Sequence, residues 1–389
     1  MKQPLAVVWN RREDTDYLGR IGPRTLRVRR LVHLGAQGSE IHDLSPDATK
    51  IAFARRSSRF RIFNIRAMKR LRDVVVGSGW PKEINWTRNR RVVVVAGNAS
   101  LSWIRIFDPV SGELLHDDVL RGMPFRAERT HEGVAFLTQQ ESREGVPLPV
   151  TLAVADDTGR VRTVRLERIK AGSYMPGGGG VVRSLEPALA VGDESAVVVG
   201  TNGVIAHVDL NSMKVTYPVE EAAFFEKLAT GLLSIAQAKF AEGRSLWATW
   251  INEQTIAITG RRTDIDTTDP DDMQFDSGCA GISLLDTTDW SLREFTGVGD
   301  QVTTGWGLVL AYDGDCRERD EPKRGLLAYT PNGEIAWRLF EGKTLYDVNV
   351  RGRLAFVTHG YKRIRLSVVD LERGSVWRTQ PSFASVLPY

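Results

Sequence analysis

The residues best suited to chemistry lie in one acidic stretch, TDIDTTDPDDMQFDSGC, at positions 263–279. Six of its seventeen residues are aspartates, and it ends on Cys279, one of two cysteines in the chain. Carboxylate oxygens are the ligands that Ca²⁺ prefers. A calcium site here would draw on Asp264, Asp266, Asp269, Asp271 and Asp272. The alternative is an acidic loop that is solvated and binds nothing.

The spacing of these aspartates favours the solvated loop. An EF-hand calcium loop needs oxygen ligands at alternate positions and a glycine at its sharp bend. Asp264 and Asp266 begin that pattern, but Pro270 interrupts it and no glycine occurs before Gly278. Irregular clusters of carboxylates still hold cations in some proteins, so both interpretations stay open. No other cofactor is indicated.

Local catalytic motifs are absent from the sequence. The six histidines are spread over different parts of the chain, without an HxH, HExxH or Cys-x-x-Cys pattern. The run PGGGGVVR at 176–183 lacks the lysine and hydroxyl residue that end a phosphate-binding loop. If the protein is an enzyme, its catalytic residues must therefore converge from separate elements of the fold.

The composition is that of a globular protein. The chain has 389 residues, 42% of them hydrophobic and 26% charged. No apolar run approaches the roughly 18 residues needed to cross a bilayer. The N-terminal stretch MKQPLAVVWNRRED shows no secretory signal, because no apolar core of about 7–15 residues follows its lysine. As written, the chain is expected to stay in the cytoplasm; an extracytoplasmic protein with a trimmed signal peptide would have the same sequence.

Charge is distributed unevenly along the chain. Residues 1–91 contain 21 Lys and Arg against 8 Asp and Glu, whereas the rest of the chain contains 31 against 40. Such asymmetry favours the approach of an anionic partner to the basic part. The basic residues alternate with apolar ones, as in RFRIFNIR at 59–66, and few aromatic residues accompany them. We therefore interpret them as exposed strand positions and find no nucleic-acid motif.

A repeat of about 40–45 residues organises the chain. Its clearest copy, SEIHDLSPDATKIAFARRSSRFRIFNIRAMKRLRDVVVG at 39–77, has four strand-like stretches separated by turn residues. The turn between the third and fourth stretches recurs eight times, at 21–28, 63–70, 107–114, 155–162, 208–215, 285–292, 329–336 and 369–376. Repeated four-stranded meanders of this length are typical of β-propeller blades. The sequence therefore predicts an all-β fold, a single β-propeller domain over residues 1–389.

Eight blades are expected, with seven as the alternative. The N-terminal copy lacks an innermost strand, and the tail PSFASVLPY at 381–389 is a spare short strand. Pairing the tail with the N-terminal strands would close the ring and leave no free blade edge. Seven blades would result if the N-terminal strands merged with the last repeat.

Several turn sequences resemble those of known propellers. LSPDATKIAFA at 44–54 resembles the Ser-Pro-Asp turn of bacterial YVTN-type and TolB-like propellers, and LAFVTHG at 354–360 is a looser relative of the Tyr-Val-Thr-Asn signature. FDPVSGELL at 107–115 and YTPNGEIAWRL at 329–339 resemble the Asp-x-x-x-Gly hairpins of quinoprotein-like repeats. The resemblance implies a propeller of WD-like repeats and carries over no activity.

Two insertions lengthen the repeat between its fifth and sixth copies. Residues 219–240 are predicted to form an amphipathic helix, which either packs on one face of the propeller or binds a partner or a membrane surface; its few basic residues favour packing on the propeller. The apolar residues that define its face, at spacings of three and four, are Phe225, Leu228, Leu232 and Ile235. The second insertion is the acidic stretch 263–279, expected as a loop between the second and third strands of its blade.

The two cysteines lie in corresponding loops of neighbouring repeats. Cys279 ends the acidic insertion, and Cys316 lies in YDGDCRERDEPKRG at 312–325, between the second and third strands of the next repeat. A disulfide forms where two cysteine Cα atoms approach within about 7 Å. Both a Cys279–Cys316 disulfide and two separate thiols are compatible with this placement. The disulfide would favour an extracytoplasmic location.

Two functions from different classes fit the sequence. We favour a non-enzymatic binding or scaffold protein, a monomer that recognises a protein, peptide or glycan on one face. The alternative is a propeller enzyme, a lyase or hydrolase, whose residues converge on the central channel. Carboxylates and histidines clustered at the axial mouth of the propeller with perturbed pKa values would indicate an enzyme, whereas an apolar or single-signed rim would indicate binding.

Overall fold

β-strands make up nearly all regular structure in the part of the chain that the computed structural model describes. It describes residues 4–387 except 11–14, 37–40, 55–57, 131, 141–145, 175–180, 220–244, 267–273, 297–298, 314–322, 361–362 and 382–383. These described residues contain no helix, and so none that could cross a membrane. The helix predicted over 219–240 lies, except for residue 219, outside them.

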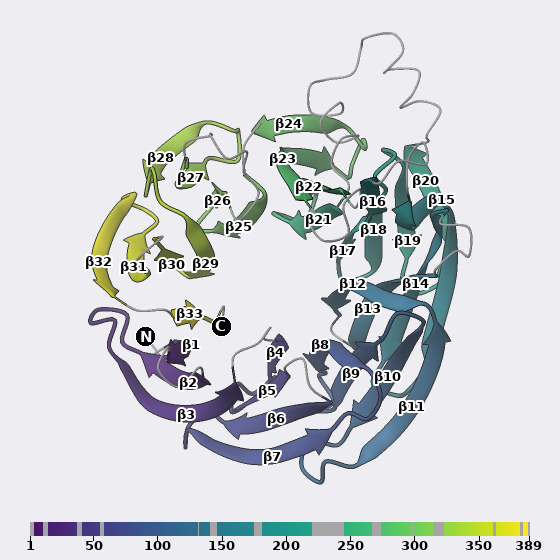
Figure 1. The fold of residues 1–389 in the computed structure, drawn as a ribbon, viewed down its shortest axis with the longest axis horizontal. Helices are drawn as coiled ribbons and strands as arrows, with labels where there is room; N and C mark the ends of the chain where they lie inside the picture. Colours follow the sequence, from purple (N-terminus) through teal and green to yellow (C-terminus); the bar gives the residue numbers. More distant parts are fainter. Residues whose placement is uncertain are drawn as a thin grey trace. The chain divides into compact units, whose positions relative to one another are not determined.

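The strands form eight four-stranded antiparallel blades, and the fold is a β-propeller (Figure 1). The chain divides into two compact units. The first unit comprises residues 1–37, 278–283 and 295–389, and the second comprises 38–277 and 284–294. The prediction of eight blades is confirmed, and the alternative of seven is wrong.

Blades 2 to 4 follow one another within the second unit. Blade 2 consists of β4 (Ile41–Leu44), β5 (Lys50–Ala54), β6 (Arg59–Asn64) and β7 (Lys69–Val75). Blade 3 consists of β8 (Trp80–Trp86), β9 (Val92–Gly97), β10 (Leu101–Phe107) and β11 (Leu114–Arg121). Blade 4 consists of β12 (Met123–Arg129), β13 (Gly133–Gln139), β14 (Leu148–Asp156) and β15 (Val161–Tyr174).

Blade 5 lies within the second unit, and blade 6 has residues in both units. Blade 5 consists of β17 (Ala188–Val191), β18 (Ser195–Val199), β19 (Ile205–Asp209) and β20 (Val215–Val219). Blade 6 consists of β21 (Ser245–Trp250), β22 (Thr255–Asp266), β23 (Gln274–Asp286) and β24 (Leu292–Thr296). A short strand, β16 (Val181–Leu185), pairs with both β15 and β22 and so joins blades 4 and 6 in one path of pairing.

The first unit contains the first and the last strands of the chain. Blade 7 consists of β25 (Gln301–Gly305), β26 (Leu308–Tyr312), β27 (Leu326–Tyr329) and β28 (Ile335–Leu339). Blade 8 consists of β29 (Leu345–Arg351), β30 (Leu354–His359), β31 (Arg365–Asp370) and β32 (Ser375–Pro381). Blade 1 combines β1 (Leu5–Asn10), β2 (Thr15–Ile21), β3 (Val28–Ala36) and the C-terminal β33 (Ala384–Val386). Ala6 pairs with Val386, which confirms that the tail completes the N-terminal blade (Figure 1).

Short polar side chains stabilise the turns that recur between the third and fourth strands. The carboxylate of Asp108 accepts hydrogen bonds from the backbone N–H groups of Val110, at 2.8 Å, and Ser111, at 2.6 Å. Asp209 forms the same kind of turn in blade 5. These hydrogen bonds favour the ionised carboxylates and lower the pKa values of Asp108 and Asp209. Turn chemistry therefore accounts for the repeated sequence pattern.

The equivalent turn of blade 8 contains a buried ion pair. Asp370 has no solvent exposure, and Arg353 donates to its two carboxylate oxygens from Nε at 2.7 Å and from Nη2 at 2.5 Å. Trp377 donates its indole N–H to the same carboxylate at 3.1 Å. The hydrogen bonds from Arg353 lower the pKa of Asp370 to about 2. This group stabilises the last hairpin of the chain.

The core lies between the faces of successive blades. All six residues of β9 are buried, because a strand within a blade packs against a neighbouring blade on each face. Val92 and Val94 pack with residues of blade 2, whereas Val93 and Val95 pack with residues of blade 4. Alternate side chains of one strand therefore serve two different cores.

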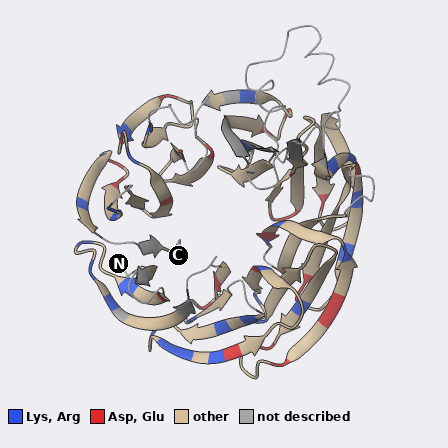
Figure 2. Ribbon diagram, in the orientation of Figure 1, with Lys and Arg blue, Asp and Glu red and all other residues tan. Residues whose placement is uncertain are grey.

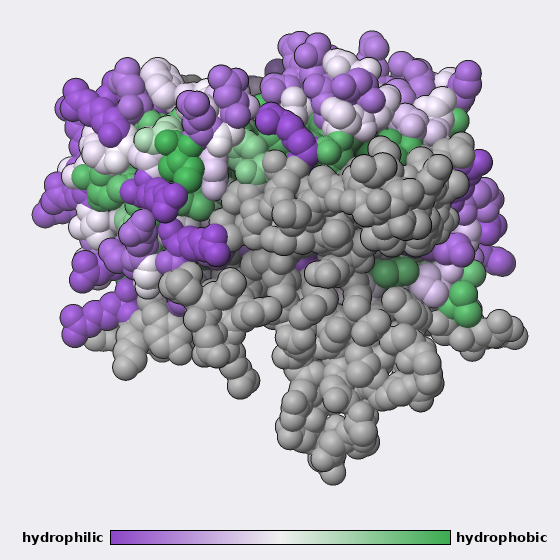
Figure 3. All heavy atoms as spheres, turned by 90° about the horizontal axis from the view of Figure 1, so that it is seen from above, coloured by the Kyte–Doolittle hydropathy of each residue, from purple (hydrophilic) through white to green (hydrophobic). Residues whose placement is uncertain are grey.

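The outer strand of blade 2 exposes charged side chains. In β7, Lys69, Arg70 and Arg72 are exposed, and Figure 2 shows their positive charge along this strand. Charged side chains on such an open strand edge oppose edge-to-edge pairing with other chains. Hydrophilic side chains also cover most of the described surface in Figure 3, with smaller hydrophobic areas between them.

Candidate functional site

The first strands of blades 2 to 6 pack against one another in order, and we call them the inner strands. They are β4, β8, β12, β17 and β21. The first three end in the same way, with a polar residue one position before the last residue of the strand. This residue is Asp43 in β4, paired with Ala52; Asn85 in β8, paired with Val93; and Glu128 in β12, paired with Ala135.

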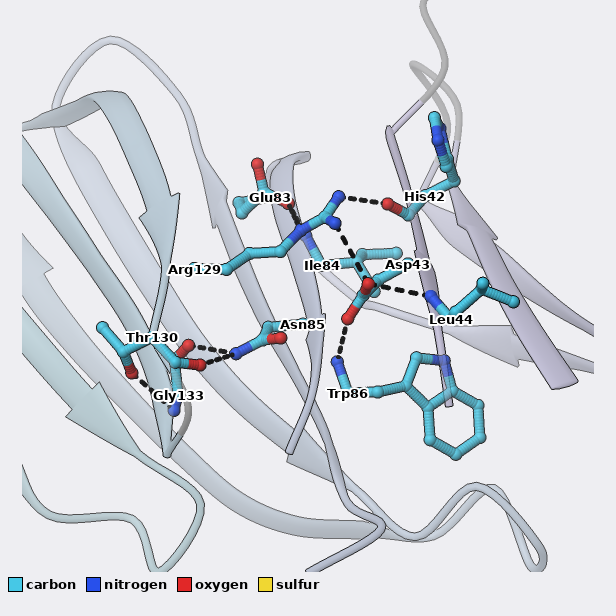
Figure 4. A network of polar contacts seen from close by, with 10 residues as sticks. All are labelled: His42, Asp43, Leu44, Glu83, Ile84, Asn85, Trp86, Arg129, Thr130 and Gly133. Carbon is cyan, nitrogen blue, oxygen red and sulfur yellow. Dashed lines mark hydrogen bonds and ion pairs between the residues drawn. The ribbon is translucent and has the colours of Figure 1, made fainter. Parts of the chain in front are cut away.

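Asp43 and Asn85 each connect their own blade to the next one. The Asp43 carboxylate accepts a hydrogen bond from the backbone N–H of Trp86, at 2.6 Å. The Asn85 side chain donates to the backbone carbonyls of Thr130, at 2.7 Å, and Gly133 (Figure 4). Both side chains thus satisfy backbone groups at the turn of the following blade. At this position of the repeat, a polar side chain is a connection between blades.

Arg129, the last residue of β12, links three inner strands. Its Nη1 donates to Asp43 at 3.0 Å, its Nε donates to Glu83 at 3.1 Å, and its Nη2 donates to the backbone carbonyl of His42 (Figure 4). Burial raises the pKa values of Asp43 and Glu83, and the positive charge of Arg129 partly opposes this effect. The positive charge of the guanidinium group partly balances the negative charges of the two carboxyl groups. Its hydrogen bonds connect β12 to β4 and β8.

Arg126, in the middle of β12, extends in the direction of blades 5 and 6. It lies at an irregularity of the strand pairing and has a φ of +47°, in the left-handed region that non-glycine residues rarely adopt. Its Nη2 donates to Glu186 at 2.7 Å, and its Nε donates to the carbonyl of Leu246 at 2.9 Å. The guanidinium group also lies 4.6 Å from the ring centroid of Trp247. Such contacts maintain a strained backbone at a defined position.

Glu128 lies between these two arginines and has no such partner. No hydrogen bond or ion pair joins its carboxyl group to another residue of the described part of the chain. The side chain reaches solvent, although the neighbouring strands surround it on other sides. This burial and the negative charge of Glu83 raise the pKa of Glu128 to about 7. Where Asp43 and Asn85 connect blades, Glu128 therefore offers an accessible carboxyl group.

We call these six groups the inner-strand site. They are Asp43, Glu83, Arg126, Glu128, Arg129 and Glu186. All belong to the second unit. With four carboxyl and two guanidinium groups, the site has a net charge of −2 when every group is ionised. It is thus a polar site of mixed sign and negative balance, suited to a ligand that supplies positive charge or hydrogen-bond donors.

The structure does not test the site residues that were predicted from the sequence. Asp264 and Asp266 belong to the end of β22, where the backbone pairs with β16, and their side chains are not described. Asp269, Asp271 and Asp272 lie outside the described residues. The segment 263–279 is also less of a loop than expected, because β22 and β23 extend into it. Within the described part of the chain, no group of three His, Cys, Asp or Glu side chains could hold a metal ion.

The predicted disulfide is not tested by the structure. Cys316 lies outside the described residues, and the side chain of Cys279, in β23, is not described either.

The inner-strand residues have a signal in the sequence that motif searches miss. Each lies just before the turn that precedes a strongly apolar strand: IHDLSPDATKIAFA, EINWTRNRRVVVVAG and AERTHEGVAFLT. When these three copies are aligned on their apolar strands, with a gap of two residues for the shorter turn of the third copy, Asp43, Asn85 and Glu128 fall in one column. A comparison of repeats with one another, rather than with known motifs, identifies that column.

The fold places the protein among the β-propellers. Similar solved structures include the computationally designed Ika8 protein, with a TM-score of 0.57, 12% identity, and coverage of 91% of this chain and 90% of that one. The dihydro-heme d1 dehydrogenase NirN in complex with DHE matches with a TM-score of 0.59 and 12% identity, over 97% of this chain and 73% of that one. BamB from Moraxella catarrhalis matches with a TM-score of 0.50 and 12% identity, over 92% of this chain and 91% of that one.

At 12% identity these likenesses extend to the fold alone. No protein-family model matches the chain, and no curated protein does.

Proposed function

We propose that this protein is a binding propeller that recognises a protein or peptide through its inner-strand site. The observation that carries the proposal is the Glu128 carboxyl group, which is accessible at a position where the equivalent side chains connect blades. Three inner strands have a polar residue at the same position, and only the carboxyl group of Glu128 is left to accept hydrogen bonds from a ligand. The Ser-Pro-Asp turn at 45–47 supports a further proposal, that the repeats are of the bacterial YVTN or TolB-like type.

The charge of the site favours a cationic group on the ligand. Arg129 and Arg126 already donate to Asp43, Glu83 and Glu186, so that Glu128 keeps its acceptor capacity. A lysine or arginine side chain would donate charge-assisted hydrogen bonds to it, each contributing about 1.5–3 kcal/mol. We therefore infer a peptide or protein segment with a basic side chain in preference to a neutral glycan.

Defined peptides test this proposal. A set of short peptides carries Lys, Arg, acetyl-lysine or citrulline at one central position, and binding is measured by fluorescence polarisation near pH 8. We expect the cationic peptides to bind and their neutral counterparts to bind at least about tenfold more weakly. Glu128→Gln removes this preference, whereas Glu113→Gln, at an exposed turn of blade 3, keeps it. Equal binding of cationic and neutral peptides, or no binding by any of them, overturns the proposal.

One observation favours the enzyme alternative. A carboxyl group with a pKa of about 7 is suited to general acid–base catalysis, as a lyase or hydrolase requires. Incubating the protein with a panel of polysaccharides and peptides, followed by detection of new reducing ends, unsaturated products or amines, tests this. Turnover that is lost in Glu128→Gln and kept in Glu113→Gln would establish the enzyme and replace the binding proposal.

A further inference from the structure

We propose that the inner-strand site is a proton-operated switch, in which Glu128, the one carboxyl group of the site that neither arginine contacts by a hydrogen bond, takes up a proton and the site thereby loses attraction for cationic groups. This inference rests on the proposed function for its biological role. The protonation itself is a property of the protein without a ligand. A measurement on the ligand-free protein therefore tests the protonation of Glu128.

The arrangement of the two arginines makes Glu128 the group that responds. Arg129 donates to Glu83, Asp43 and a backbone carbonyl, and Arg126 donates to Glu186 and another carbonyl. Neither guanidinium group donates to Glu128, which lies on the strand between them. Each of the other three carboxyl groups receives a hydrogen bond from one of these guanidinium groups, whereas the carboxyl group of Glu128 receives none and interacts with both positive charges only at longer range.

The surroundings of Glu128 decide the direction of the switch. Besides Arg126 and Arg129 on β12 itself, the ionisable groups of the surrounding elements are Lys82 and Glu83 on β8, His42 and Asp43 on β4, Glu186 before β17, and Arg105 on β10, which is paired with Asp117. Strands β9, β13 and β17 contain no ionisable residue. Glu83 repels the ionised form of Glu128, and burial disfavours it further. Both effects make proton uptake easier than in an exposed glutamate.

The switch changes the charge of the site without rearranging its contacts. Protonation takes the net charge of the six groups from −2 to −1 while the partners of both arginines stay unchanged. A protonated carboxyl group also becomes a hydrogen-bond donor, which opposes the donors of a bound ammonium or guanidinium group. Below the titration midpoint, affinity for a cationic ligand should therefore fall about tenfold for each pH unit, as the ionised fraction falls.

Carboxyl NMR of the ligand-free protein tests the switch. The full chain is labelled with ¹³C at the glutamate side-chain carboxyl, titrated from about pH 4 to about pH 9, and compared with Glu128→Gln to assign the resonance. We expect a midpoint within about one pH unit of 7, and a lower midpoint in Glu83→Gln, since the repelling charge is removed. Circular dichroism confirms that each variant is folded. A midpoint for Glu128 between about 4 and 5, as in exposed glutamates, overturns the proposal.

Peptide binding over the same pH range separates this inference from the proposed function. If Glu128 titrates near neutral pH and lysine peptides bind more weakly as pH falls, with a flat profile in Glu128→Gln, both are supported. If Glu128 titrates near neutral pH and no peptide binds, the switch is upheld and the proposed function fails. If peptides bind but the midpoint lies between about 4 and 5, the switch fails and the binding proposal stands.

Discussion

Replacing Glu128 by glutamine is expected to stabilise the protein at about pH 8 and to change little at about pH 4. The pKa of Glu128 is raised in the folded protein to about 7, from 4.5 for an ordinary glutamate. Below about pH 4.5 the group is protonated in both folded and unfolded states, so it has no effect on stability. Between about pH 4.5 and 7 the unfolded state loses this proton while the folded state keeps it, so stability falls over this range and stays lower above it.

The magnitude follows from the difference between the two pKa values. For a fully buried carboxyl group this difference would correspond to about 3 kcal/mol at high pH. Glu128 is exposed to solvent, which screens the charge, so we expect about 1 kcal/mol. Glutamine keeps the size and hydrogen-bonding capacity of the side chain but has no charge. For a chain of this length the gain corresponds to an increase in melting temperature of roughly 1–2 °C.

Thermal denaturation followed by circular dichroism at several pH values measures this effect. The difference in melting temperature between Glu128→Gln and the unmodified protein should grow from about pH 5 to about pH 8. Glu113→Gln is the matched control, because it removes a carboxylate from an exposed turn of blade 3. A difference that is the same at both ends of the range, or a destabilised variant at high pH, would refute the account of Glu128.

Four further predictions concern other parts of the chain. Arg129→Gln leaves two carboxyl groups without their shared cation and should destabilise the protein by about 2–3 kcal/mol, measured by urea denaturation. Asp370→Asn should lower the melting temperature at neutral pH by roughly 2–4 °C and have little effect near pH 2, since the lowered pKa gives stability above about pH 4 that is lost as pH falls. A calcium site in 263–279 predicts a higher melting temperature with calcium than with chelator, and identical temperatures argue against it. A disulfide between Cys279 and Cys316 predicts that alkylation adds mass only after reduction; alkylation without reduction contradicts it.

The number of blades was predictable from the sequence because turns are local. Asp108 and Asp209 receive hydrogen bonds from backbone groups two and three residues later, so the signal for each turn lies within a few positions. Eight such turns are visible in the sequence, and each separates the third from the fourth strand of a blade. The closing strand was predictable as well, since blade 1 lacked a strand and residues 381–389 offered one.

The extent of the strands in blade 6 was less predictable. The aspartates of 263–279 are typical of a loop, yet β22 continues to Asp266 and β23 begins at Gln274. Pairing of Asp264 with Arg183 of β16 extends the sheet there. Strand propensity is weak compared with the effect of a neighbouring strand, and in this case the neighbouring residue, Arg183, comes 81 positions before Asp264 in the chain.

By itself, the sequence determined the repeat, its turns and the alternation of apolar residues, since each depends on neighbours a few residues apart. Only the tertiary structure decided which polar side chains meet. Arg129 reaches Asp43 across 86 positions and Glu83 across 46, and Arg126 reaches Leu246 across 120. Packing of the inner strands sets these distances, and with them the pKa of Glu128. The chemistry of the candidate site is therefore a property of the assembled blades.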